Sequence, residues 1–217
     1  MKKIVLTLKK TVHITNLIIS KFKKMKGYTQ IENIENYLLT EIRENFQYQI
    51  NEWIENAENY IDKKTGRNFI ADTIPLERSY DGDGTSELLI DDCVSIEKIE
   101  IKTTSGDIIY NNLQPGIDYF LEPANEIPKQ SIRLKGIFPK GIQNIKITAK
   151  WGYSEEVPKD IKFATTVLVA NIVSYSNQSN GEIQSLNVGS YSVSFKDQEK
   201  RDDFEKVEEI LDSYVKY

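Results

Sequence analysis

The chain has 217 residues and a mass of 25.0 kDa, with 39% hydrophobic and 28% charged residues, which is typical of one soluble globular domain or one domain with an added subdomain. A single cysteine, Cys93, excludes an intrachain disulfide and a cysteine-rich zinc site, and a single histidine, His13, argues against thiol and triad enzymes. We therefore expect no catalytic residue, no cofactor and no metal.

Charge is distributed unevenly along the chain. Residues 1–28 carry eight lysines and no acid, so the rest of the chain keeps 20 of the 28 basic and all 33 acidic residues, a net charge of −13. The basic segment lacks the apolar run of a signal peptide or a membrane span. It is either an extension outside the fold, with Met25 as a second possible start, or a basic arm for anionic lipid or nucleic acid.

Two amphipathic helices are expected after the basic segment. Thr29 and Glu32 match a capping box, which predicts a helix over residues 30–43. A second helix is predicted to end near Gly66, because six apolar residues form one stripe at helical spacing. That stripe consists of Ile50, Trp53, Ile54, Ala57, Tyr60 and Ile61.

Short runs of β type follow between Pro75 and Tyr153, separated by turns rich in Gly and Pro. They predict an antiparallel region of two sheets. The expected strands are Glu87–Ile90, Ile96–Lys102, Ile108–Tyr110, Tyr119–Leu121, Ser131–Leu134 and Asn144–Trp151.

A third helix is expected from Pro158 to Tyr175, followed by a polar loop over residues 176–190 and a short strand at residues 189–195. A charged helix is expected over residues 201–217. The fold class is therefore α+β, with a helical core (an αα-hairpin plus a third long helix), an inserted antiparallel β subdomain and a C-terminal helix.

This order predicts three regions. Residues 1–28 form a basic extension outside the fold, and residues 29–200 form the main domain, with its helical core at 29–70 and 157–176 and its β subdomain at 75–153. Residues 201–217 form a C-terminal helix that either packs on its own core or docks on a partner.

Local clusters of polar residues carry no strong signal for chemistry. Asp81 and Asp83 begin a calcium-like loop, but Ser86 and Asp92 stand where the EF-hand pattern requires Gly and Glu, so a turn between strands is expected. The paired acids Asp91 and Asp92 are interpreted as solvated charges. Lys63–Arg67 lacks the spacing of a phosphate loop and indicates a helix end.

Three segments resemble the head–tail connector proteins of tailed bacteriophages, also called adaptor or head-completion proteins. Ile50–Phe69 is similar to their helix followed by T-G-R-x-F, and Asn144–Ala164 is similar to their strand, W-G-Y turn and P-x-D-I-x-x-A helix. Gly189–Phe195 resembles their short strand after a variable loop. The matching fold residues are Trp53, Thr65, Gly66, Arg67, Phe69, Trp151, Gly152, Tyr153, Pro158, Ile161 and Ala164.

The resemblance implies a structural virion protein rather than an enzyme. Such a protein of a phage or prophage forms a ring under the portal, twelvefold by the symmetry of that vertex, joins the DNA-filled head to the tail or stopper, and extends the DNA channel. The implied partners are the portal protein, a stopper or tail-completion protein, further copies of the chain, and double-stranded DNA that passes without specific binding. The implied location is the virion, after assembly in the host cytoplasm, with no membrane involved.

The resemblance also suggests functional residues. In connectors the C-terminal segment commonly reaches the portal, which implies portal contacts by Phe204, Val207, Ile210, Leu211 and Tyr214. A loop can face the channel, which here implies Asn177, Gln178, Ser179 and Asn180.

Other functions remain open from the sequence. Another virion ring or tail-associated binding module predicts an exposed aromatic patch, and a carboxylate-dependent hydrolase predicts two convergent acids in a cleft. A peripheral membrane protein predicts salt-sensitive binding through residues 1–24.

Overall fold

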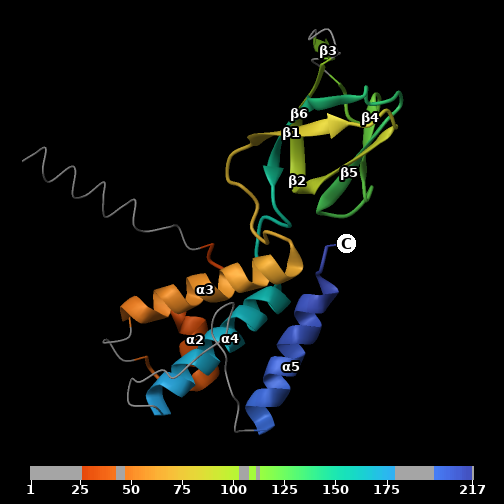
Figure 1. The fold of residues 1–217 in the computed structure, drawn as a ribbon. Coiled ribbons are helices and arrows are strands. Elements are labelled where there is room, and N and C mark those ends of the chain that lie inside the picture. Colours follow the sequence, from red (N-terminus) through yellow and green to blue (C-terminus); the bar gives the residue numbers. More distant parts are fainter. Residues whose placement is uncertain (1–25, 43–46, 103–107, 111–112, 179–197, 217) are drawn as a thin grey trace, which may run out of the picture.

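The computed structural model describes residues 26–42, 47–102, 108–110, 113–178 and 198–216. Helices form one lobe and an antiparallel sheet forms the other, beyond the C-terminal end of α3 (Figure 1). This arrangement confirms the predicted α+β class. No helix within the described residues is long and apolar enough to span a membrane.

The first described helix, α2, covers Ile31–Leu38 and is shorter than predicted. Leu39 takes a left-handed conformation (φ 52°) and ends the helix, and Glu35 accepts the backbone N–H of Ile42 on its side chain. The predicted capping box is wrong. Gln30 is the cap residue, and the Thr29 hydroxyl lies 2.7 Å from that of Thr166 instead, because burial against α4 provides it with a tertiary partner.

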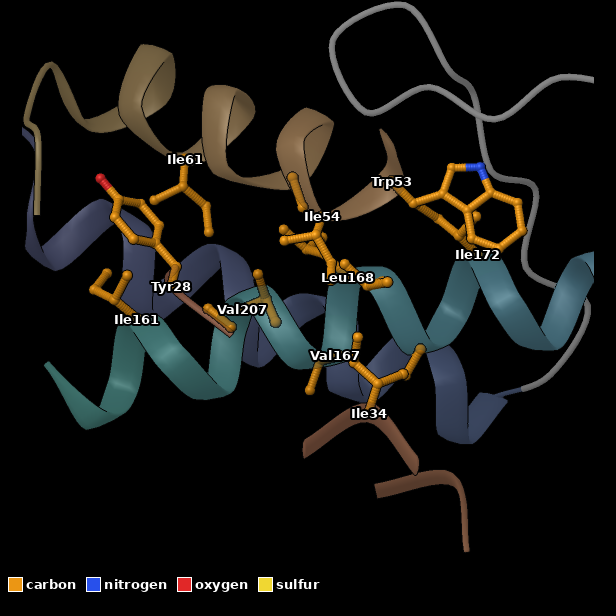
Figure 2. Close-up of a cluster of buried hydrophobic side chains, with 14 of the residues drawn as sticks. Tyr28, Ile34, Trp53, Ile54, Ile61, Ile161, Val167, Leu168, Ile172 and Val207 are labelled. Carbon is orange, nitrogen blue, oxygen red and sulfur yellow. The ribbon is translucent and has the colours of Figure 1, made fainter. Parts of the chain in front are cut away.

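The long helices α3 (Gln47–Thr65) and α4 (Lys159–Gln178) build the helical core. Ile50, Ile54 and Ile61 on α3 are fully buried, as the apolar stripe predicted. Figure 2 shows Ile54 pointing toward Leu168 of α4, with Ile61 and with Val207 of α5 (Gln198–Ser213) in the same cluster. Burial of such aliphatic side chains is the main source of stability for this lobe.

Tyr28 belongs to this core, which corrects the boundary of the predicted N-terminal extension at residues 26–28. Its side chain is fully buried, and its ring packs edge-on against Phe69 with centroids 5.8 Å apart. The backbone N–H groups of Gly27 and Tyr28 both donate to the Glu58 carboxylate. Residues 1–25 lie outside the described residues.

The β lobe is one six-stranded antiparallel sheet in the order β1-β6-β2-β5-β4, with β3 paired to β2. This corrects the prediction of two sheets. Its strands are β1 (Leu76–Gly82), β2 (Glu87–Lys102), β3 (Ile108–Tyr110), β4 (Tyr119–Glu122), β5 (Lys129–Leu134) and β6 (Gly141–Trp151). A second hydrophobic cluster fills one face of the sheet around Trp151, Phe138 and Ile132.

Two strands differ from the prediction. The expected strands 87–90 and 96–102 are one 16-residue strand, β2, which bends at register breaks near Cys93 and pairs with β5 before the break and with β6 after it. The strand β1 had not been predicted. It is an edge strand with largely exposed side chains, so it lacks the apolar alternation that marks a half-buried strand.

Candidate functional site

The T-G-R-x-F segment forms the path from the helices to the sheet. Gly66 ends α3 with φ +68°, and its N–H donates to the Asp62 carbonyl at 2.8 Å. This confirms the predicted helix end at Lys63–Arg67. Phe69 is then fully buried in the helical core.

The W-G-Y segment forms the return path and lies against the outgoing one. The N–H of Gly152 donates to the Asp92 carbonyl at 2.7 Å, and the N–H of Tyr153 donates to the Asn68 carbonyl at 2.8 Å. Gly152 has φ +138°, and a Cβ there would lie 2.5 Å from the Cα of Ala71. Only glycine fits this crossing of two backbones.

Arg67 connects three parts of the chain at this junction. Its Nε donates to the Tyr214 carbonyl at 2.6 Å, and its NH1 donates to the Asp92 carboxylate at 2.7 Å. The guanidinium also lies over the Tyr153 ring, 5.5 Å from its centre. The two charged side chains are only 12% and 5% exposed, so this ion pair is largely withdrawn from water.

The end of the chain closes the same junction. The backbone N–H of Lys216 donates to the Thr65 carbonyl at 2.9 Å, and its ammonium donates to the Ile90 carbonyl at 3.2 Å. The ring of Tyr214 packs edge-on against Phe69, with centroids 5.3 Å apart. The junction therefore joins the end of α3, strand β2 and the end of the chain.

A polar cleft of about 250 Å³ opens beside these contacts. Its charged groups pair with one another, because Asp91 accepts from Arg78 at 2.7 Å and Asp92 accepts from Arg67. Burial works against ionisation of Asp91, but the hydrogen bonds from Arg78 and Tyr80 outweigh it and lower the pKa of that carboxyl. Asp92 is buried and paired with Arg67, which corrects its interpretation as a solvated charge, whereas Asp91 remains exposed although it pairs with Arg78.

This arrangement is suited to holding two lobes together. Arginine stays protonated at all relevant pH values, so Arg67 is a permanent positive charge beside Asp92. Among the described residues, no group of three or more His, Cys, Asp or Glu side chains forms a metal-binding cluster.

The fold residues of the resemblance gather in two places. At the junction lie Thr65, Gly66, Arg67, Phe69, Trp151, Gly152 and Tyr153. In the helical lobe lie Trp53, Ile161 and Ala164, all buried, with Pro158 directly before α4.

The residues suggested for portal contact pack against the chain's own core. Val207 and Leu211 are fully buried, and Phe204, Ile210 and Tyr214 are partly buried against the same cluster. In this structure α5 packs on its own core. The sequence had left this alternative open beside docking on a partner. Contact with a portal stays a prediction.

The suggested channel loop falls at the edge of the described chain. Asn177 and Gln178 are the last residues of α4 rather than loop residues, because the helix continues three residues beyond Tyr175. Ser179, Asn180 and the predicted strand at residues 189–195 lie outside the described residues.

Sequence reasoning missed the acidic clamp on α3. Glu58 is 1% exposed and accepts the backbone N–H groups of Lys26, Gly27 and Tyr28 at 2.7 to 2.9 Å. Asp62 accepts the Tyr28 hydroxyl at 2.6 Å and pairs with the Lys26 ammonium. One signal was present: Glu58 lies four residues after Ile54 and three before Ile61, on the apolar stripe itself.

Comparison with known proteins gives matches only among solved structures. No protein-family model matches the chain, and no curated protein matches it. A chain from the neck of an empty gene transfer agent particle, computed with C6 symmetry, has a TM-score of 0.55 at 11% sequence identity. The match covers 88% of this chain and 91% of that one.

Two further structures agree. A chain from the neck of the native gene transfer agent particle, computed with C12 symmetry, has a TM-score of 0.51 at 11% identity and covers 87% of this chain and 93% of its own. A chain from the virion of the native gene transfer agent has a TM-score of 0.51 at 13% sequence identity. The match covers 88% of this chain and 91% of that one. The chain therefore shares the fold of proteins found in the neck and virion of a phage-like particle.

Proposed function

We propose that this chain is a structural protein of the head–tail junction of a phage or phage-like particle. It forms a ring under the portal, joins the DNA-filled head to the tail or stopper, and extends the DNA channel. It catalyses no reaction and acts in the virion, after assembly in the host cytoplasm.

The observation that carries this proposal is the extent of the fold match. About nine-tenths of this chain aligns with about nine-tenths of the neck chains, so the likeness includes both lobes rather than one common motif. The independent resemblance in T-G-R-x-F and W-G-Y supports it, because those two segments meet at the junction between the lobes.

The charge of the body suits a channel protein. Residues 29–217 carry a net charge of −13, so their surface repels phosphate over several ångströms. Double-stranded DNA would pass such a ring without binding to it.

The proposed portal contact uses α5. Phe204, Ile210 and Tyr214 keep part of their surface accessible, so they are available to a portal while α5 stays in place. Contact through Val207 or Leu211 would require α5 to leave the core.

The test is the mass of the full chain in solution, by light scattering, alone and mixed with the portal protein encoded by the same phage or prophage. We expect a closed complex of ring size with that portal, seen as a ring by electron microscopy. A portal from an unrelated phage is the control and should give no complex. A chain that stays monomeric with its own portal at every concentration would contradict the proposal.

A further inference from the structure

We infer that residues 74–76 of one copy occupy a groove beside strand β4 of the next copy in the ring. The β lobes of neighbouring subunits would then contact one another through opposite ends of their sheets. This inference rests on the proposed function, because it assigns a contact between subunits of the ring.

The groove lies at the β4 end of the sheet and has a volume of about 390 Å³. Phe120 and Leu121 of β4 line it, together with Arg133 of β5, which pairs with Phe120 in the sheet. The Phe120 side chain is 44% exposed, which is unusual for a large aromatic group. An exposed aromatic ring in a groove marks a surface that binds a partner.

The charged groups of the groove leave an excess of positive charge. Its lining contains two basic side chains and one acidic one, which are Lys129, Arg133 and Glu122. The Lys129 ammonium donates to the Ala124 carbonyl at 2.9 Å, a neutral acceptor that does not cancel its charge. Arg133 is half exposed and reaches Glu87 only at 3.7 Å. The groove therefore suits an apolar segment that carries negative charge.

Residues 74–76 have the apolar character that the groove requires. Ile74 is 65% exposed and Leu76 is 45% exposed, so two large aliphatic side chains face solvent within three residues. Pro75 lies between them and fixes its own φ, so the segment loses little conformational entropy on binding.

The same segment carries the opposite charge. Residues 72–77 contain two acids, Asp72 and Glu77, and no basic residue. Glu77 also pairs with Lys146 of its own chain, which holds it at the start of β1. Acids on both sides of an exposed apolar segment match the cationic groove and would orient the two surfaces as they meet.

The segment of one copy cannot fill the groove of the same copy. Strands β1 and β4 stand at the two ends of the strand order, with β6, β2 and β5 between them. In Figure 1 the chain that leads into β1 and the strands β4 and β5 lie on opposite sides of the β lobe.

Hydrogen bonds also fix this segment at its own end of the sheet. The N–H of Asp72 donates to the Trp151 carbonyl at 2.8 Å, and the Trp151 indole donates to the Leu76 carbonyl at 2.7 Å. A ring built from one kind of subunit joins two different faces, one from each neighbour. The segment and the groove are two such faces, so each copy would supply one and accept the other.

The first test is cross-linking of full chains in the presence of the portal protein encoded by the same phage or prophage. Chains with Ile74→Cys are mixed with chains with Phe120→Cys and treated with a short bismaleimide. We expect cross-links between the two kinds of chain, and these necessarily join two copies. Each variant alone is the control and should give none, because Cys93 is buried.

The second test compares how strongly two variants associate into the ring. Ile74→Ser should weaken each contact between subunits about tenfold, as expected when one aliphatic side chain is no longer buried there. The matched control is Leu39→Ser, because Leu39 is 92% exposed but lies in the helical lobe, and it should associate normally. Both side chains face solvent in the single copy, so both variants should fold.

Three results would overturn the inference. Rings without cross-links in the mixed sample would show that the two surfaces do not meet. Equal association of Ile74→Ser and Leu39→Ser would show that the segment contributes nothing. Weaker assembly of Phe120→Ser, with normal assembly of Ile74→Ser, would assign the groove to another occupant such as the portal or the stopper.

The two proposals fail in different ways. Rings that form with the portal but give no cross-link between the segment and the groove would leave the proposed function intact and refute the contact. Cross-links in open chains that never close with the portal would support the contact and refute the ring.

Discussion

Gly152 sets the closest backbone approach at the junction, and it gives a test at the scale of one residue. Gly152→Ala adds a Cβ that would lie 2.5 Å from the Ala71 Cα at a φ of +138°, so it meets both a clash and backbone strain. We expect a loss of about 3 kcal/mol or more in the free energy of unfolding, measured by urea denaturation.

Gly116→Ala is the matched control, because Gly116 also has a positive φ (+77°) but no atom within 4 Å of the added Cβ. Strain alone should cost about 1–2 kcal/mol there. Equal losses for the two variants would show that the crossing of the backbones adds no constraint.

Cys93 predicts how stability depends on alkaline pH. Burial, with the nearby charge of Asp92, raises the pKa of this thiol from 9.0 to about 12. The unfolded chain therefore loses the thiol proton first. Stability is complete below pH 9 and falls as the pH rises towards 12, by up to about 1.4 kcal/mol per pH unit.

The measurement is the free energy of unfolding between pH 8 and 10, compared with that of a Cys93→Ala variant, because unfolded tyrosines, whose usual pKa is about 10, also begin to lose protons in this range. Cys93→Ala should lower stability overall, because it leaves a cavity, but it should flatten this pH dependence. An unchanged slope in the variant would mean that another group causes it.

Single residues show which features the sequence predicts and which it does not. Burial of Ile54 and Ile61 follows from local spacing and was predicted. The hydrogen-bond partners of Asp92 and Glu58 do not follow from local spacing. Arg67 lies 25 positions from Asp92 in the sequence, and Gly27 lies 31 positions from Glu58. An acid in a polar run is expected to be solvated until the fold brings a distant donor to it.

At the scale of elements, α5 makes the clearest prediction. Leu211 is fully buried against the helical core, so Leu211→Ala should lower the free energy of unfolding by about 2–5 kcal/mol. The exposed Glu209→Ala on the same helix should change it by less than about 0.5 kcal/mol. Thermal unfolding of the full chain separates the two cases, and similar values would mean that α5 does not pack on the core in solution.

The elements also differ in how readily the sequence predicts them. Helix α3 carries an apolar stripe at helical spacing, which only Glu58 interrupts, and the third helix was expected to within a few residues. The strand β2 was predicted as two strands, because Asp91 and Asp92 interrupt its apolar pattern. The structure keeps the strand whole, since Arg78 and Arg67 neutralise these acids. The edge strand β1 carries no apolar alternation and gave no signal.

At the scale of the whole molecule, the Arg67 contacts should set how firmly the two lobes hold together. Arg67→Met leaves Asp92 buried without its cation and frees the Tyr214 carbonyl. We expect a loss of about 3–5 kcal/mol in stability and a larger radius of gyration by small-angle X-ray scattering.

Arg78→Met is the control, because the ion pair of Arg78 with Asp91 lies at the surface, with side chains 42% and 53% exposed. It should cost about 1 kcal/mol or less and leave the scattering unchanged. A compact Arg67→Met chain would mean that the backbone contacts alone hold the lobes in place.

The outgoing and returning segments at the junction have a consequence for how such proteins diversify. The N–H of Ala71 donates to the Ser154 carbonyl at 2.9 Å, and that of Asp72 donates to the Trp151 carbonyl at 2.8 Å, so the chain leaves the helices and re-enters them at one point. Apart from Ile90 and Asp92, which contact the junction, the β lobe between these residues can lengthen or shrink as a single unit, because the spacing of α3 and α4 is set by their own packing. A lineage of such chains can thus remodel what the β lobe presents to neighbouring proteins without redesigning the helices that carry it.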